Sequence, residues 1–175
     1  MVCGNPSPAR FQPMPVEAPL VLHREAVLSE WIDYNGHMNM AYYVLVFDHG
    51  TDALLDYIGI SESFREQHTC STFTAEIHIT YLKEAHLGDE LLIKNQLLGF
   101  DQKRVHYFQQ MHNANSGELL ATAEMMSLYM DMRSRRVAAM PKPIIDKLHK
   151  IEQAHQDLPR PEQVGRIIGI RGARS

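Results

Sequence analysis

Cysteine is scarce in this 175-residue chain, and a long uninterrupted apolar run is missing. Its two cysteines, Cys3 and Cys70, form no CxxC pair, which argues against a structural disulfide and predicts inert thiols. No stretch approaches the ~18 continuous apolar residues of a membrane-spanning helix. The Pro-rich segment 1–19 lacks the apolar run of a secretory signal. We therefore expect a soluble cytoplasmic protein that does not contact a membrane.

Basic residues are also in the minority. Lys and Arg number 17 against 21 Asp and Glu, which gives a net charge of −4. This balance argues against nucleic-acid binding, which needs a dense basic face, but it leaves room for a local phosphate-binding patch. The 45% apolar and 22% charged composition is that of a single globular domain. We expect a loose N-terminal arm over 1–19, one domain over 20–156 and a C-terminal tail over 157–175.

One long helix is predicted between Asn39 and Gly59. Asn39 can cap its start and Gly59 can end it. Its apolar stripe comprises Met40, Tyr43, Val44, Phe47, Thr51, Leu54, Leu55 and Ile58. Strands are predicted over 20–32, 71–86, 89–100, 103–114 and 118–132, and a second helix over 141–156.

Strands that follow one another through tight turns predict an antiparallel sheet. The sequence therefore predicts an α+β fold, in which a long central helix is wrapped by about five antiparallel strands. One helix covers only one face of such a sheet, so the other face or an edge needs a partner. We expect a homodimer or homotetramer.

The stretch from Asp33 to Tyr43, DYNGHMNMAYY, carries the candidate chemistry. It places a carboxylate on a turn, a glycine, and then a helix start, whose free N–H groups and positive dipole end can hold an oxyanion. Asp33 could attack a carbonyl or activate water there. The alternative is that Asp33 only caps the turn and His37 only packs it. Asp48, on the polar side of the helix, is a weaker catalytic candidate, and the role of a solvated or salt-bridged helix acid fits it better.

These residues resemble the signature of hotdog-fold thioesterases of the 4-hydroxybenzoyl-CoA thioesterase type. The matching positions are Asp33, Gly36, His37, Met38, Asn39 and Tyr43, and the segment Thr80–Glu90 resembles the family's central strand and Gly-Asp turn. The resemblance implies a hotdog fold, with Asp33 as the catalytic carboxylate and the backbone N–H near Met40 as the oxyanion donor. Gly36, His37 and Asn39 would shape the turn. Met40 departs from the pattern, because relatives often have a second Asn there.

Longer stretches resemble the betainyl-CoA thioesterases of carnitine breakdown. They are 30–39, 47–48, 51–56, 71–78, 101–106 and 130–136. The resemblance implies hydrolysis of betainyl-CoA to glycine betaine and CoA without metal or cofactor. A trimethylammonium group favours aromatic faces, and we expect them in an acyl pocket formed by Trp31, Tyr34, Tyr42 and Tyr43. Core packing is the alternative role for these rings.

The CoA phosphates need cations. The candidates are Lys103, Arg104, Arg133, Arg135 and Arg136, which are otherwise ordinary surface charges. The histidines His78, His106 and His112 alternate along strands and match no metal-binding motif. Two rival functions stay open: a hotdog thioesterase for other short, medium or aromatic acyl-CoAs, and a non-catalytic acyl-CoA-binding module. A hotdog dehydratase fits less well, because it would need a histidine poised for proton abstraction.

Overall fold

A computed structural model describes residues 15–170 of the chain. The elements in chain order are β1 (Leu20–Ala26), the 3-10 helix η1 (Ser29–Trp31), α1 (Met40–Ile58), α2 (Glu62–His68), β2 (Cys70–Tyr81), β3 (Glu90–Phe100), β4 (Arg104–Asn113), β5 (Leu119–Asp131), β6 (Arg136–Val137) and α3 (Lys142–His155). The α+β architecture predicted from the sequence is confirmed. The short elements α2 and β6 were not predicted, and β1 is shorter than the predicted strand because its last residues turn into η1.

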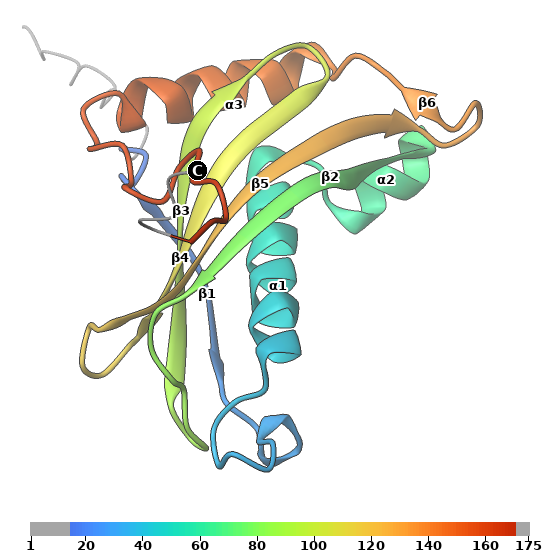
Figure 1. The fold of residues 1–175 in the computed structure, drawn as a ribbon. Helices are drawn as coiled ribbons and strands as arrows, with labels where there is room; N and C mark the ends of the chain where they lie inside the picture. The colour runs from blue at the N-terminus through green and yellow to red at the C-terminus, as the bar shows by residue number, and fades with distance from the viewer. Residues whose placement is uncertain (1–14, 171–175) are drawn as a thin grey trace, which may run out of the picture.

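The sheet is antiparallel throughout, in the order β1-β3-β4-β5-β2, with β6 paired to the end of β5. It curls around α1, and α3 lies across the end of the sheet at which α1 ends (Figure 1). β1 and β2 are the two long edge strands. Within residues 15–170, no helix combines the length and apolarity that a bilayer crossing would require.

Local capping chemistry sets both ends of α1. The Asn39 side chain accepts a hydrogen bond from the Ala41 N–H, and Gly59 ends the helix in the left-handed region at φ 98°. The buried face differs from the predicted stripe. Met40 and Val44 are 64% and 37% exposed, whereas Val46 is fully buried. The reason is that the curled sheet covers only one side of the helix, so part of the apolar stripe stays uncovered.

Helix α1 approaches the sheet most closely at Gly50. A Cβ added to this residue would lie 2.7 Å from the Ile93 Cγ2 atom and 3.1 Å from the Gln109 Nε2 atom. Ile93 and Gln109 are both fully buried on neighbouring strands, so neither can easily move aside. Glycine therefore sets the spacing between α1 and β3.

Gly50→Ala should lower the free energy of unfolding by ~1–3 kcal/mol, the usual effect of overpacking. Alanine favours a helix over glycine by ~1 kcal/mol, so propensity alone predicts the opposite sign. Urea unfolding measures the change. Ala53→Gly on the same helix is the matched control for propensity, and stabilisation by Gly50→Ala would contradict the close approach.

The buried His155 joins α3 to the irregular part of β3. Its Nδ1 atom accepts a hydrogen bond from the Leu97 N–H at 3.0 Å, where the β3–β4 register shifts, and its Nε2 atom donates to the Glu17 carbonyl at 3.1 Å. Burial lowers the pKa of His155 from its usual 6.5, and the hydrogen bond to Glu17 offsets part of that effect. The neutral ring is the form that can accept from Leu97.

The chain should therefore lose stability as the pH falls below about 6.5. As the pH falls, His155 is protonated in the unfolded chain before it is protonated in the folded chain. The contribution of the neutral ring to the free energy of unfolding is therefore complete above the unfolded pKa, and it is lost as the pH falls through the lowered folded pKa. His155→Asn should cost ~1–3 kcal/mol near neutral pH and flatten the decline. Urea unfolding at about pH 5 and pH 8 checks this. His149→Asn, which changes an exposed histidine of the same helix, is the control and should lose stability at low pH as the wild type does. The same loss in His155→Asn would contradict the interpretation.

The predicted arm and tail are described only in part. Residues 1–14 of the arm and 171–175 of the tail lie outside the described residues. Ahead of β1, Val16 packs against the core and the Glu17 carbonyl accepts from His155. The tail crosses the outer face of the sheet, where the Gly165 N–H donates to the Glu124 carboxylate at 2.7 Å.

Candidate active site

The loop that precedes α1 folds around the Asp33 carboxylate. Ile32 and Met38 form an isolated antiparallel bridge, and the Asp33 N–H donates to the His37 carbonyl at 3.1 Å. Gly36 closes the turn at φ 82°, a conformation that few other residues adopt readily. Asp33 is thus held at the base of a tight turn, close in the chain to a helix start.

Both oxygens of the Asp33 carboxylate accept hydrogen bonds. Oδ1 accepts from the Asn35 N–H at 2.8 Å, and Oδ2 accepts from the Asn39 side-chain amide at 3.3 Å. Asn39 uses its other amide atom, Oδ1, to cap the Ala41 N–H at 3.0 Å. One asparagine therefore links the carboxylate to the first turn of α1 and fixes their relative orientation.

Met40 is the first helical residue. Its backbone N–H donates no hydrogen bond within residues 15–170, as is usual for the first turn of a helix. The positive end of the helix dipole adds to the field at this point. Asn39, which contacts the Asp33 carboxylate, directly precedes this free amide. A carboxylate and a free amide are the groups that attack on a carbonyl carbon and stabilisation of the resulting oxyanion require.

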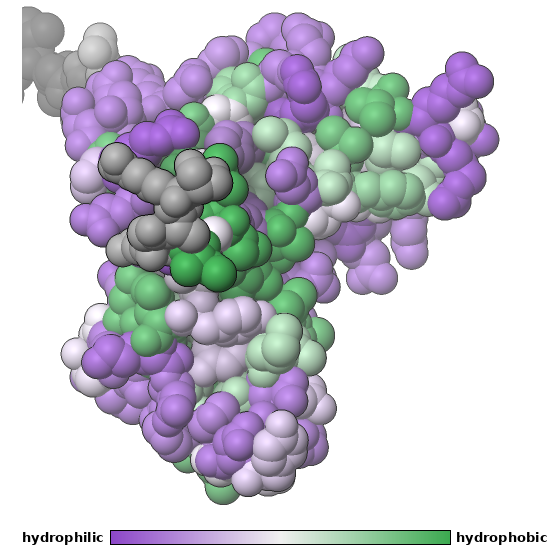
Figure 2. Space-filling model, viewed as in Figure 1, coloured by the Kyte–Doolittle hydropathy of each residue, from purple (hydrophilic) through white to green (hydrophobic). Residues whose placement is uncertain are grey.

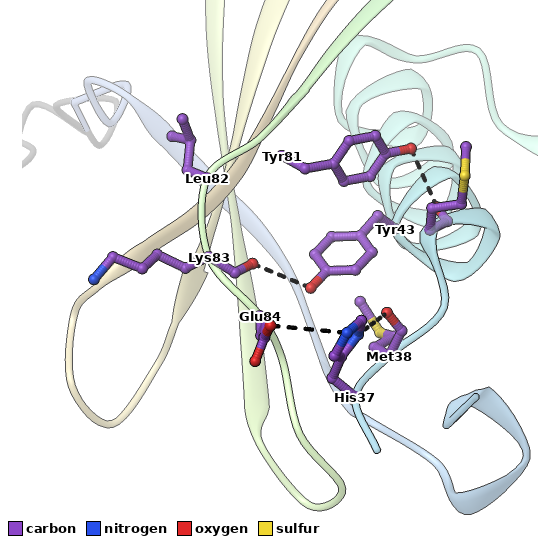
Figure 3. A pocket seen from close by; sticks show the side chains of 8 residues that line it. His37, Met38, Tyr43, Tyr81, Leu82, Lys83 and Glu84 are labelled. Atoms are coloured by element: carbon purple, nitrogen blue, oxygen red, sulfur yellow. Dashed lines mark hydrogen bonds and ion pairs between the residues drawn. The ribbon is translucent and has the colours of Figure 1, made fainter. Parts of the chain in front are cut away.

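A cavity of about 340 Å³ opens next to this helix start. Its lining comes from three segments of the chain and comprises His37, Met38, Met40, Tyr43, Tyr81, Leu82, Lys83 and Glu84. Figure 3 shows the Tyr43 and Tyr81 rings reaching from α1 and β2 toward the space between the two elements, whereas the Lys83 side chain points away. The Glu84 carboxylate lies 3.8 Å from the His37 Nε2 atom. The cavity is thus aromatic on one side and polar on the other.

Tyr43 joins α1 to the segment that follows β2. Its hydroxyl donates to the Lys83 carbonyl at 3.2 Å and accepts from the Ala85 N–H at 2.9 Å. Burial is the main cause that raises the pKa of Tyr43, and the hydrogen bond from Ala85 opposes it. The phenol stays protonated at neutral pH and keeps both hydrogen bonds. Its ring meets Tyr81 edge-on, with 5.3 Å between centroids.

The structure does not gather the four predicted aromatic residues into one pocket. Tyr43 lines the cavity, but the buried Trp31 stacks on Tyr42 with 5.4 Å between ring centroids, and Tyr34 is 96% exposed. The ring that packs beside Tyr43 in the cavity is that of Tyr81, which was not among the predicted pocket residues. Nearness in sequence suggested the first grouping, whereas Tyr81 arrives from a distant strand. Its position as the last residue of the alternating strand, shortly before a Gly-Asp turn, is the sequence signal that could have identified it.

The predicted phosphate-binding residues lie at the other end of the sheet. Arg133 and Arg135 lie in the turn that joins β5 to β6, and Arg136 begins β6. The Arg135 guanidinium lies over the Phe73 ring at 5.9 Å. Arg104 forms an ion pair with Asp101 at 2.6 Å and holds the pKa of that carboxyl at about 2. In the chain alone, these cations are far from the cavity (Figure 1).

The three strand histidines named in the sequence analysis have separate surroundings. Within residues 15–170, neither His78, His106 nor His112 belongs to a group of three converging metal-ligating side chains. His106 pairs instead with Glu124 at 2.8 Å. One such group occurs elsewhere and comprises His23, Glu25 and His49, which no sequence motif indicated.

Comparisons with known proteins agree on one class. The profile of the Thioesterase-like superfamily matches residues 27–148. The betainyl-CoA thioesterase of Pseudomonas aeruginosa is 38% identical over 151 residues, which cover 86% of this chain and 95% of that protein. The L-carnitine dehydrogenase/betainyl-CoA thioesterase of Rhizobium meliloti is 38% identical over 95% of this chain but only 32% of its own length. A Staphylococcus aureus protein solved in complex with CoA superposes with a TM-score of 0.82 at 30% identity, over 90% of this chain and 99% of that one.

Proposed function

Since the chain belongs to the Thioesterase-like superfamily and has the hotdog fold, we propose that it hydrolyses betainyl-CoA at a site formed by Asp33 and the start of α1. The observation that carries the proposal is the link from the Asp33 carboxylate through the Asn39 side chain to the Ala41 N–H in the first turn of α1, where the Met40 N–H is free, beside a cavity lined by two tyrosine rings. A module that only bound acyl-CoA would not require this carboxylate. The products are glycine betaine and free CoA.

The reaction needs a nucleophile on one side of the thioester carbonyl and a hydrogen-bond donor on the other. The Met40 N–H and the helix dipole stabilise the carbonyl oxygen as it gains negative charge. Asp33 either attacks the carbonyl carbon itself or removes a proton from an attacking water. The C–S bond then breaks, and the CoA thiolate leaves and takes up a proton. In the first route, water hydrolyses the resulting anhydride.

The cavity suits a small cationic acyl group. Ring faces attract a quaternary ammonium by ~0.5–2 kcal/mol each, depending on desolvation. Tyr43 and Tyr81 provide two rings at right angles, and Glu84 provides a negative charge on the opposite side. A quaternary ammonium donates no hydrogen bond, so it gains from these rings what an ordinary ammonium would gain from acceptors.

The neutral isostere 3,3-dimethylbutanoyl-CoA should therefore be a poorer substrate than betainyl-CoA, by roughly 5-fold to 100-fold in kcat/KM. The two acyl groups have nearly the same shape, so the ratio of their kcat/KM values isolates the effect of charge. A spectrophotometric assay of thiol release gives both values. Equal or better turnover of the neutral substrate would favour the rival reading, a general acyl-CoA thioesterase.

Tyr81 offers a matched pair of variants for this ratio. Tyr81→Phe keeps the ring and removes only the hydroxyl, which donates to the Met40 carbonyl at 3.2 Å. Tyr81→Leu removes the ring as well. We expect Tyr81→Phe to retain the preference for the charged substrate and Tyr81→Leu to lose most of it.

We further propose that two chains pair along β2. This 12-residue strand is an edge of the sheet, and it carries the partly exposed apolar side chains Phe73, Ile77 and Tyr81. Figure 2 shows hydrophobic surface along the region where β5 and β2 lie. An unpaired apolar edge of this length favours pairing with another chain. The exposed apolar side of α1, which includes Met40, Val44 and Leu45, is a second surface that a monomer leaves in water.

Antiparallel β2–β2 pairing would bring the separated parts of the site together. β2 spans roughly 35 Å at ~3.3 Å per residue, with the cavity at its Tyr81 end and the arginine turn beside its Cys70 end. A two-fold axis near the middle of the strand places each end next to the opposite end of the partner. The arginines of one chain would then lie near the cavity of the other, where the CoA phosphates need them.

A further inference from the structure

A histidine–glutamate–histidine cluster, formed by His23, Glu25 and His49, lies where β1 meets α1, outside the cavity. The Glu25 Oε1 atom lies 2.7 Å from the His23 Nε2 atom and 2.8 Å from the His49 Nδ1 atom. The two imidazole rings meet edge-on, with 5.7 Å between centroids. All three potential ligand atoms lie within 4.8 Å of one another, and no other group of three metal-ligating side chains in residues 15–170 converges in this way.

The fold holds this cluster in place from both sides. His23 is the register partner of Ile93, the residue against which Gly50 brings α1 into closest contact with the sheet. His49 precedes Gly50, so the same close approach carries its ring to the edge strand. His23 and Glu25 are two residues apart on one strand and therefore point to the same face. The backbone thus sets the positions of all three side chains.

Two imidazole nitrogens and one carboxylate oxygen form a donor set that Zn²⁺ and similar divalent transition metals prefer. Ligand atoms around a tetrahedral zinc lie ~3.4 Å apart, given bonds of ~2.0–2.2 Å. The present separations of 2.7 and 2.8 Å would need to widen by about 0.6–0.7 Å. The side chains are 23%, 19% and 39% exposed for His23, Glu25 and His49, so the ion could enter from solvent and keep a water as its fourth ligand.

We propose that this cluster, the β1–α1 clip, binds one zinc-class divalent cation per chain. The ion ties the edge strand β1, whose one neighbour in the sheet is β3, to the helix that begins beside Asp33. A ligand that binds only the folded chain stabilises it by mass action. The site is structural and does not depend on the identity of the acyl-CoA substrate.

The test uses the untagged full-length chain with Cys3→Ser, freed of metal by chelator dialysis. Isothermal titration with Zn²⁺ should show one saturable equivalent per chain, and Mg²⁺ should show none. With Zn²⁺ at about 100 times its Kd, the Tm should rise by about 5 °C or more. Co²⁺ in the same protein should give the visible d–d absorption of an ion with nitrogen and oxygen ligands.

His23→Gln and His49→Gln are the matched variants, because an amide can still donate to Glu25 but is a poor zinc ligand. Each should weaken Zn²⁺ binding at least ~10-fold. His149→Gln changes an exposed histidine that also pairs with a glutamate, Glu152, and should bind like wild type. Unchanged affinity in both clip variants, an equal loss in His149→Gln, or no saturable site would overturn the proposal. If the clip variants fail to fold, the cobalt spectrum of the wild-type chain decides, and its absence counts against the site.

Discussion

Asp33→Asn should lower kcat by at least ~100-fold, the scale expected when a positioned base or nucleophile is lost. The amide keeps the shape of the side chain, and its oxygen can still accept one of the two hydrogen bonds from Asn35 and Asn39. It lacks the charge that attacks the carbonyl or deprotonates water. Thiol release from betainyl-CoA measures the effect. Asp56→Asn, which changes an exposed carboxylate near the end of α1, should stay within a few-fold of wild type.

The loss of activity must be measured on an Asp33→Asn variant that is folded. Circular dichroism and thermal unfolding should show that Asp33→Asn is folded, because the hydrogen bonds to its side chain are few and partly exposed. A folded variant with activity within a few-fold of wild type would remove Asp33 from the mechanism. In that case the carboxylate only stabilises the turn.

Water labelled with ¹⁸O can establish direct attack by Asp33, because no other route puts the label into the Asp33 carboxylate. In a single turnover with excess enzyme, direct attack leaves labelled oxygen in the Asp33 carboxylate after the anhydride is hydrolysed at that carbon, or in the product after attack at the acyl carbon. Activated water labels the product alone. Mass spectrometry of the peptide that contains Asp33 detects the label, and its presence there establishes the covalent route.

Two inactive variants should restore activity when mixed as one dimer. One chain carries Asp33→Asn, and the other carries Arg133→Ala, Arg135→Ala and Arg136→Ala. If the phosphates are bound by the partner, each mixed dimer holds one intact site, made of Asp33 from the second chain and the arginines of the first. Co-expression with random pairing should then recover about a quarter of the wild-type sites.

Chains with self-contained sites would give a different result. Every site in the mixed dimer would then lack either Asp33 or the arginines, and the mixture would be no more active than its parents. Light scattering on the wild type supplies the companion measurement. A fully active monomer would contradict both the pairing along β2 and the shared site.

The sequence predicted well those features that local chemistry determines. Asn39 and Gly59 fix the ends of α1 through capping and a left-handed turn, and neither effect depends on the rest of the chain. The face of α1 that is buried was harder to predict. Met40 and Val44 are apolar and correctly spaced, yet the sheet curves away from them, and no local pattern encodes that curvature.

In the candidate site, too, the residues that are close in sequence were easier to predict than those that long-range strand pairing brings together. Asp33, Gly36, His37 and Asn39 are close in sequence and lie in one turn, so a local motif was enough to group them. The aromatic grouping failed because Trp31 and Tyr42 pack on each other, although both are near Asp33 in sequence. Tyr81 and Glu84 reach the cavity only through the pairing of β2 with β5, which depends on strand register across the whole sheet.

The Tyr43 hydroxyl has a consequence for the range of acyl groups. It bridges α1 and the segment after β2 with two hydrogen bonds, so the length of one phenol side chain sets the width of the cavity. A variant with a wider cavity must either give up both bonds or move the backbone of residues 83–85. Adaptation to bulkier thioesters would therefore proceed through insertions or substitutions in that segment, while the helix and its tyrosine stay as they are.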